Sequence, residues 1–297
     1  MPCQRYTTLF RSPDLTIGDY HCRPATCAEG SEEQSCAPSI ALLRTGAFTR
    51  RIGRARQIAD ANWAVFFHPD VTYHVSHPTD QGDDCSVFTP SPRLLAEVLE
   101  DVDPRATRGA SPAVPVDQAP TSSRVHLIHH LLFGSVRRGA DGLEIEELAL
   151  RLVRAVLRDA ARFRGASPKR PGRTDTHAAH VELVERTKLE LARRVCDRPT
   201  LSDVAGAVHA SPYHLSRVFS RSVGVPMNRY MDRLRLRHAL DRLADDRLPI
   251  TSVALDAGYY DHSHFTNAFR REFGLTPSRC RREGRTTLRE MSKSFQV

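Results

Sequence analysis

The sequence contains no apolar run of 18 residues, the length at which a helix begins to span a bilayer. Its first residues lack the basic start, long apolar stretch and small-residue cleavage site of a secretion signal. No phosphate-binding loop, nucleophile elbow or pair of catalytic carboxylates occurs in the 297 residues. These absences predict a soluble, cytoplasmic protein with no membrane contact, no enzymatic activity and no cofactor.

Charge divides the chain into two unlike parts. Residues 1–163 carry a net charge of −2, whereas residues 175–297 carry a net charge of +6, and the segment 164–174 adds four more positive charges. A surface that contacts phosphate must be basic, so a partner of this kind is expected on the C-terminal part. The length allows two domains.

One pattern occurs twice in the C-terminal part. It reads V-A-G-A-V-H-A-S-P-Y-H-L-S-R-V-F from Val204 and V-A-L-D-A-G-Y-Y-D-H-S-H-F-T-N-A-F from Val253. The copies are 49 residues apart before a turn signal and 50 after it, so the extra residue falls in the turn. Each copy has small residues, a turn, a helix-capping Ser or Asp, and then apolar residues at helical spacing. The pattern predicts two helix-turn-helix units, at 201–222 and 250–273, and therefore a partner of double-stranded DNA.

These residues resemble the AraC/XylS family of bacterial transcriptional regulators. The likeness is carried by S-P-x-H-L-x-R-x-F in the first unit and by A-G-Y-x-D-x-S-H-F-x-x-A-F-R-R-x-F-G-x-T-P-S from Ala257 in the second. The resemblance implies a sequence-specific regulator that binds promoter DNA, with recognition helices in successive major grooves about 34 Å apart. It further implies a small-molecule effector, contact with RNA polymerase and a homodimer.

The fold implied by the resemblance is α+β with two domains. An N-terminal cupin-like β-barrel with helices precedes an all-α double helix-turn-helix domain. The expected boundaries are 1–163 for a sensor and dimerisation domain, with the β segment at about 15–90 and helices at about 92–163, then 164–176 for a linker, 177–284 for the DNA-binding domain and 285–297 for a tail.

The two second helices carry the residues expected to touch DNA. Arg217 suits guanine and Asn267 suits adenine, because their side chains offer two matched hydrogen bonds to those bases. The full set expected at base edges is Tyr213, Ser216, Arg217, His262, Ser263, Thr266 and Asn267. The set expected at phosphates is Arg221, Arg229, Arg270, Arg271, Arg279 and Arg281.

The same helices predict a set of buried residues. Helical spacing places Leu215, Phe219, Phe265 and Phe269 in the core, and His214 and His264 next to them are expected in buried capping or packing positions. A helix at 226–244 is expected to join the two units, with its leucines inward and its arginines outward. The outward set is Arg229, Arg233, Arg237 and Arg242.

The N-terminal part gives weaker signals. Pro104–Pro120 is rich in Pro, Ala and Ser and predicts an exposed loop. Leu143–Phe163 predicts a helix with one apolar stripe, and by analogy with the family this helix is assigned to dimerisation. The stripe consists of Ile145, Leu148, Leu152, Val156 and Phe163.

Histidines and cysteines leave two alternatives. His68, His74 and His77 have no ligand spacing that includes a carboxylate, so no metal site is predicted. A thiol- or metal-responsive regulator using Cys22, Cys27 and Cys36 stays open, although intervals of five and nine residues match no zinc pattern. A methyl-accepting DNA repair protein is the remote alternative, since such proteins can carry the same type of domain.

Overall fold

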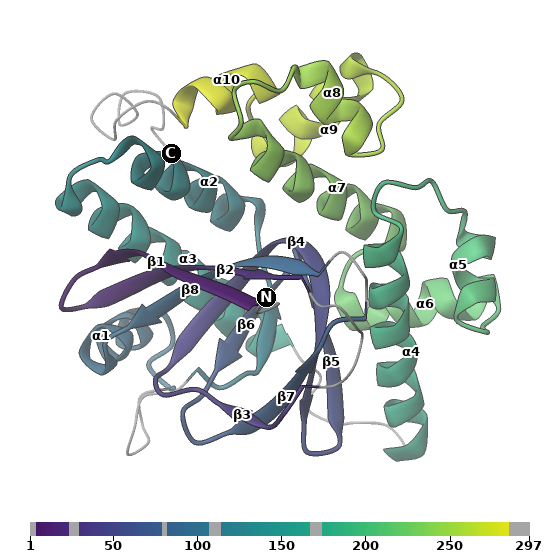
Figure 1. Ribbon diagram of the computed structural model, residues 1–297. Helices are drawn as coiled ribbons and strands as arrows, with labels where there is room; N and C mark the ends of the chain where they lie inside the picture. The colour runs from purple at the N-terminus through teal and green to yellow at the C-terminus, as the bar shows by residue number, and fades with distance from the viewer. Residues whose placement is uncertain (1–3, 24–29, 79–81, 107–113, 167–173, 285–297) are drawn as a thin grey trace.

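The computed structural model describes residues 4–23, 30–78, 82–106, 114–166 and 174–284. It has a sheet-rich N-terminal domain and a helical C-terminal domain, as the sequence predicts (Figure 1). The strands are β1 (Gln4–Arg11), β2 (Leu15–Cys22), β3 (Glu33–Gln34), β4 (Ser39–Ile52), β5 (Ala55–Asp60), β6 (Trp63–Phe67), β7 (Thr72–Ser76), β8 (Asp83–Pro90) and β9 (Gln118–Pro120). The helices are α1 (Pro92–Val102), α2 (Ser123–Arg138), α3 (Gly142–Ala166), α4 (Thr174–Arg193), α5 (Leu201–Ala207), α6 (Pro212–Val223), α7 (Met227–Leu243), α8 (Ile250–Asp256), α9 (His262–Phe273) and α10 (Pro277–Glu283).

The sheet is organised around β4, which is 14 residues long. Its first half pairs with β8 and β6, and its second half pairs with β5 and β7. A register shift between Leu43 and Thr45 is followed by Gly46 at φ 75, so the strand passes from one group of partners to the other there. The main path runs β1-β2-β8-β4-β6-β9, and no pairing joins β1 to β9 among the described residues. The expected barrel is therefore not closed.

The expected loop at Pro104–Pro120 is only partly a loop. Gln118–Pro120 forms β9 against β6, and Val114 and Ala119 are buried in the core of this domain. Small apolar residues between prolines predict a loop in the sequence, but here some of them form the edge strand of the sheet. Residues 107–113 of this stretch lie outside the described part.

Helix α3 covers the segment assigned to dimerisation, and its apolar stripe belongs to the core of the same domain. Ile145, Leu148, Leu152 and Val156 are each at most 6% exposed and pack into the core with α1, α2 and β9. Burial within the same chain leaves these side chains no surface for a second copy. Phe163 lies partly buried at the edge and contacts Trp63, with ring centroids 5.6 Å apart.

The C-terminal domain is built on α7, which lies between the two helix-turn-helix units (Figure 1). The first turns of this helix place Tyr230, Met231 and Leu234 in the core of the first unit. Its later turns place Leu236, Ala239, Leu240 and Leu243 in the core of the second unit. The two units therefore share one rigid helix, as predicted for 226–244. At the domain boundary α3 and α4 extend into the expected linker 164–176, of which 167–173 lies outside the described residues, as does the tail 285–297.

A buried polar interface joins the two domains. The Tyr230 hydroxyl donates to Asp60 Oδ2 at 2.5 Å and accepts from Trp63 Nε1 at 2.9 Å. The ammonium group of Lys188, on α4, lies 4.3 Å from the centre of the Trp63 ring. Both Asp60 and Lys188 are 0% exposed. Burial raises the pKa of Asp60, and the nearby Lys188 cation opposes that rise.

Arg237 is the second tie between the domains, and its predicted outward position is wrong. It is 4% exposed and donates to the carbonyl oxygens of Ala61 and Thr121 and to Asn62 Oδ1. Burial lowers the pKa of Arg237 to about 10. The sequence could not reveal this position, because an arginine on the polar face of a helix normally faces water.

The two units repeat the backbone conformation as well as the sequence. Gly224 and Gly274 end α6 and α9 in the left-handed region, at φ 80 and φ 77. The turns after α5 and α8 also use that region, at His209 with φ 53 and at Gly258 with φ 78. A Cβ on Gly258 would lie 2.9 Å from the carbonyl oxygen of Cys196, so this turn also needs glycine for space.

Opposite substitutions in the two turns should therefore have opposite effects. We expect His209→Gly to raise the free energy of unfolding by up to about 1 kcal/mol, because glycine adopts positive φ without strain. Gly258→Ala should lower it by about 2 kcal/mol or more, since strain and the contact with Cys196 add. Urea denaturation of both variants and the wild type measures these changes. A loss of stability in His209→Gly would contradict the account of the first turn.

Candidate nucleic-acid interface

The helices α6 and α9 begin in the same way and are anchored by the same kind of core. Ser211 and Asp261 cap them, each accepting a hydrogen bond from the backbone N–H three residues later. The predicted core residues are confirmed, because Leu215, Phe219, Phe265 and Phe269 are each 0% exposed. These contacts fix which face of each helix points outward.

The outward faces carry the residues expected at base edges. Arg217 and Asn267 are exposed and occupy equivalent positions, 50 residues apart. Tyr213 is 77% exposed and is equivalent to Ser263. The exposed members of the set are Tyr213, Arg217, His262, Ser263 and Asn267, and the half-buried members are Ser216 and Thr266.

Thr266 differs from the others in the direction of its hydroxyl. Its Oγ1 atom is buried and has no hydrogen-bond partner among the described residues. Ser216, at the equivalent position, lines an open hollow between the two units that also includes His264 and Tyr260. A base contact from Thr266 would require a rotation of its side chain, whereas Ser216 already faces this hollow.

The two histidines beside the core are not buried, contrary to the prediction. His214 and His264 are exposed, and each takes part in capping through its backbone N–H rather than its ring. The ring of His214 packs against His180 with centroids 5.6 Å apart, and the ring of His264 packs edge-on against Tyr259 at 5.3 Å. Both rings thus lie at the surface that carries the candidate base contacts.

The arginines expected at phosphates fall into two groups. Arg221, Arg270 and Arg271 are exposed at the ends of the two recognition helices. Arg279 is 44% exposed and forms an ion pair with Glu283 at 2.6 Å. These four side chains are at the surface, so none of them would have to move out of the core to contact a phosphate.

Arg229 and Arg281 have structural partners instead. Glu272, whose side chain is 5% exposed, pairs with Arg229 at 3.0 Å and with Arg233 at 3.2 Å. Arg281 donates to the carbonyl oxygen of Leu243, which ends α7, at 3.2 Å. The sequence missed Glu272 as the acceptor that holds this end of the domain together, because an isolated glutamate in a basic helix gives no signal of burial.

The cysteines and histidines that the sequence offers as candidate ligands lie in different environments. Cys22 is buried, Cys36 is exposed, and Cys27 lies outside the described residues. His74 lies 3.2 Å from the carbonyl oxygen of Gly30, whereas His77 is buried. Cys22 and Cys36 thus lie in different environments, and the alternative that joins them with Cys27 stays open.

Comparison with known proteins agrees with this geometry. A family model described as a helix-turn-helix domain matches residues 204–283. The HTH-type transcriptional regulator GlxA of Rhizobium meliloti (strain 1021) is 34% identical over 128 residues, which are 43% of this chain and 38% of that protein. The HTH-type transcriptional activator RhaS of Salmonella arizonae is 30% identical over 162 residues, which are 53% of this chain and 54% of that protein. The chain thus spans about half or less of these relatives.

A solved structure of apo ToxT from Vibrio cholerae covers 92% of this chain and 98% of that one, with 11% identity and a TM-score of 0.40. The C-terminal domain contains two helix-turn-helix units. This domain is similar to the helix-turn-helix domains of these transcriptional regulators, as the resemblance to the AraC/XylS family predicts. None of the helices in the described part is long and apolar enough to cross a membrane.

The exposed arginines give a measurable electrostatic prediction. Each phosphate contact contributes about 0.9 to the slope of log affinity against log salt. We expect Arg270→Ala with Arg271→Ala to reduce the magnitude of this slope by about 2 and to weaken binding to all DNA sequences alike. The matched control is Arg162→Ala, which removes a 75% exposed arginine of α3. Fluorescence anisotropy across a salt series measures the slopes, and equal slopes in the double variant and the control would contradict the assignment.

Proposed function

We propose that the chain is a sequence-specific transcriptional regulator in which one subunit reads an asymmetric DNA site through two recognition helices. The observation that carries the proposal is the contrast between α6 and α9. Their buried residues match, Phe219 with Phe269, whereas the equivalent exposed residues differ, Arg217 and Asn267. Like scaffolds with unlike surfaces suit two different half-sites.

The base assignments predict separable effects on specificity. Arg217→Ala should relax the preference for guanine in one half-site, and Asn267→Ala should relax the preference for adenine in the other, each by about 1–3 kcal/mol. Selection from a randomised DNA library, followed by sequencing of the bound fraction, measures both preferences. Each variant serves as the control for the other. Loss of preference at the same position in both variants, or no loss in either, would overturn the assignments.

A signal for the regulator would enter through the sheet-rich domain, which we assign as a cupin-like sensor with an open sheet. A hollow of about 400 Å³ in this domain is lined by Ile40, Phe66, Phe67 and Leu95, with Asp70 and Asp117 at its polar side. An apolar wall with a few polar groups is typical of small-molecule sites. A small, largely apolar effector fits this chemistry best.

The buried interface supplies the connection between such a sensor and the DNA-reading surface. Asp60 and Trp63 from the sheet-rich domain contact Tyr230 on α7, and α7 carries residues of both reading units. A movement of β5 or β6 would therefore act on the helix that fixes the two units relative to each other. The Tyr230 hydroxyl forms hydrogen bonds with both Asp60 and Trp63.

Removal of that hydroxyl should weaken the joint between the domains. Tyr230→Phe leaves a buried Asp60 oxygen without its donor, so we expect the free energy of unfolding to fall by about 1–3 kcal/mol. Tyr213→Phe makes the same chemical change at a 77% exposed position and should leave stability unchanged. Urea denaturation of the two variants gives the comparison. An equal effect of both substitutions would show that the hydroxyl does not hold the interface.

Contact with RNA polymerase and formation of a homodimer belong to the same proposal. A dimer would use a surface other than the buried stripe of α3. The exposed apolar side chains of that helix are Leu143 and Leu150, at 76% and 39% exposure. The proposal assigns no catalytic role to any residue, and methyl transfer to a cysteine in the intact chain would contradict it.

A further inference from the structure

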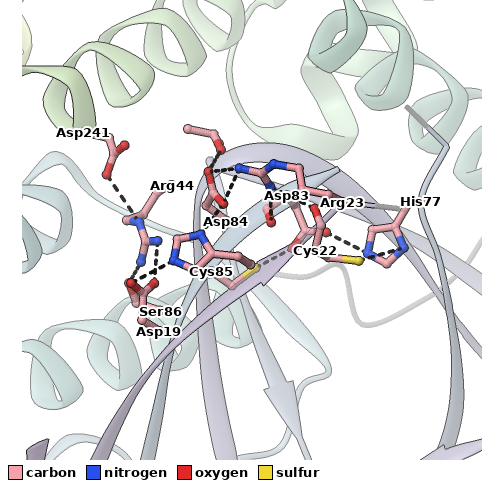
Figure 2. Close-up of polar contacts among 12 residues, drawn as sticks. Asp19, Cys22, Arg23, Arg44, His77, Asp83, Asp84, Cys85, Ser86 and Asp241 are labelled. Atoms are coloured by element: carbon pink, nitrogen blue, oxygen red, sulfur yellow. Dashed lines mark hydrogen bonds and ion pairs between the residues drawn. The ribbon is translucent and has the colours of Figure 1, made fainter. Parts of the chain in front are cut away.

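Four side chains with acid–base or metal-binding chemistry meet at one end of the sheet. Cys22 ends β2 and is paired in register with Asp83, which begins β8. His77 follows the end of β7, and Cys85 lies two residues along β8. Figure 2 shows Cys22, Asp83 and His77 side by side, with the Cys85 sulfur directed at the Asp83 carboxylate.

The three side chains offer ligand atoms that are close enough to be drawn onto one ion. Cys22 Sγ, a ring nitrogen of His77 and a carboxylate oxygen of Asp83 lie within 4.8 Å of one another. Cys22 Sγ is 3.8 Å from His77 Nδ1, close to the separation of about 3.6 Å between sulfur and nitrogen in a tetrahedral zinc site. Asp83 Oδ1 lies 2.7 Å from the other ring nitrogen, Nε2, so an ion bound at Nδ1 would require the Asp83 carboxylate to turn from Nε2 toward that ion.

Burial makes the charge of Asp83 costly in the absence of a cation. Asp83 and Cys22 are each 1% exposed, and His77 is 6% exposed. The distance from Asp83 Oδ1 to His77 fits an ion pair, but its angles do not fit a hydrogen bond, and that oxygen has no hydrogen-bond partner among the described residues. The neighbouring guanidinium of Arg23 binds the carboxylate of Asp84 instead, at 2.7 and 2.9 Å.

We propose that Cys22, His77 and Asp83 bind a divalent cation of the zinc class. A thiolate, a carboxylate and a neutral imidazole together carry two negative charges, which a divalent cation balances inside the domain. The mixture of sulfur, nitrogen and oxygen favours zinc over a hard cation such as magnesium. Three protein ligands leave a fourth position for water or a small ligand.

Cys85 has a positioning role in this site. Its thiol donates to Asp83 Oδ2 at 2.9 Å, which leaves Oδ1 for the cation. Partners that orient a ligand in this way typically change metal affinity by about 10–100-fold. Cys85→Ala should therefore weaken binding by about that factor, whereas Cys85→Ser, which retains a donor, should bind nearly as tightly as the wild type.

Metal content and cobalt spectroscopy of the full chain test the site without DNA, so the outcome is independent of the proposed function. We expect about one zinc ion per chain after incubation with a zinc salt and dialysis, and loss of that ion in Cys22→Ser. Cys36→Ser changes an exposed cysteine and is the matched control, which should retain the metal. Circular dichroism of each variant shows that it is folded.

If Cys22→Ser does not fold, the absorption spectrum of the cobalt-substituted wild type still tests whether Cys22 is a ligand. A thiolate-to-cobalt charge-transfer band in the near ultraviolet is expected, because Cys22 is a ligand. The proposal is overturned if the wild type takes up no zinc or cobalt, if folded Cys22→Ser retains as much zinc as Cys36→Ser, or if the cobalt form lacks the thiolate band.

Discussion

The contact between Asp60 and Tyr230 fixes the sheet-rich domain against α7, on which the helical domain is built. A carboxylate at 0% exposure carries a desolvation penalty that water cannot relieve, so its acceptors must be filled by the protein. The Tyr230 hydroxyl and the backbone N–H of Asn62 fill them, and Lys188 supplies the nearest opposing charge. Since Tyr230 and Lys188 belong to the helical domain, the sheet-rich domain cannot satisfy its own buried acid without its neighbour.

This dependence explains the unusual composition of α7. Most helices at the surface of a domain have one apolar stripe, but α7 contacts the first unit, the second unit and the sheet-rich domain. Arg237 therefore enters a buried site among carbonyl oxygens, where a leucine would leave Ala61 and Thr121 without donors. The polar residues of α7 are thus part of its packing against the other domain.

The repeat explains why some features could be predicted and others could not. Capping by Ser211 and Asp261 and burial of Phe219 and Phe269 follow from local spacing, which the sequence displays directly. The burial of Arg237 depends on residues more than 100 positions away, and no local pattern contains it. His214 shows the opposite error, because adjacency to a core residue does not decide the side of the helix on which a ring lies.

The cluster of Cys22, His77 and Asp83 could not be predicted from the sequence for the same reason. Cys22, His77 and Asp83 have no common spacing, and only the pairing of β2 with β8 brings the first and last together. The hypothesis drawn from the sequence instead grouped cysteines that are near one another along the chain. It joined Cys22 with Cys36, which is exposed. Antiparallel pairing places the end of one strand beside the start of its partner, so ligand sets at sheet ends have no fixed interval.

Strand β8 connects this cluster to the C-terminal domain, because Asp83 lies on the same strand as a residue whose contacts lead to α7. Asp83 and Ser86 are three residues apart on one strand, and Ser86 Oγ accepts from Arg44 Nη1 at 2.7 Å. Arg44 Nε in turn lies 3.3 Å from Oδ1 of Asp241 on α7. Figure 2 shows these two side chains directed toward each other. Packed strands and helices transmit small displacements because their contacts tolerate little compression. If the proposed ion binds, a displacement of Asp83 would act on β8, whose contacts lead through Ser86 and Arg44 to Asp241 on α7, the helix shared by the two helix-turn-helix units.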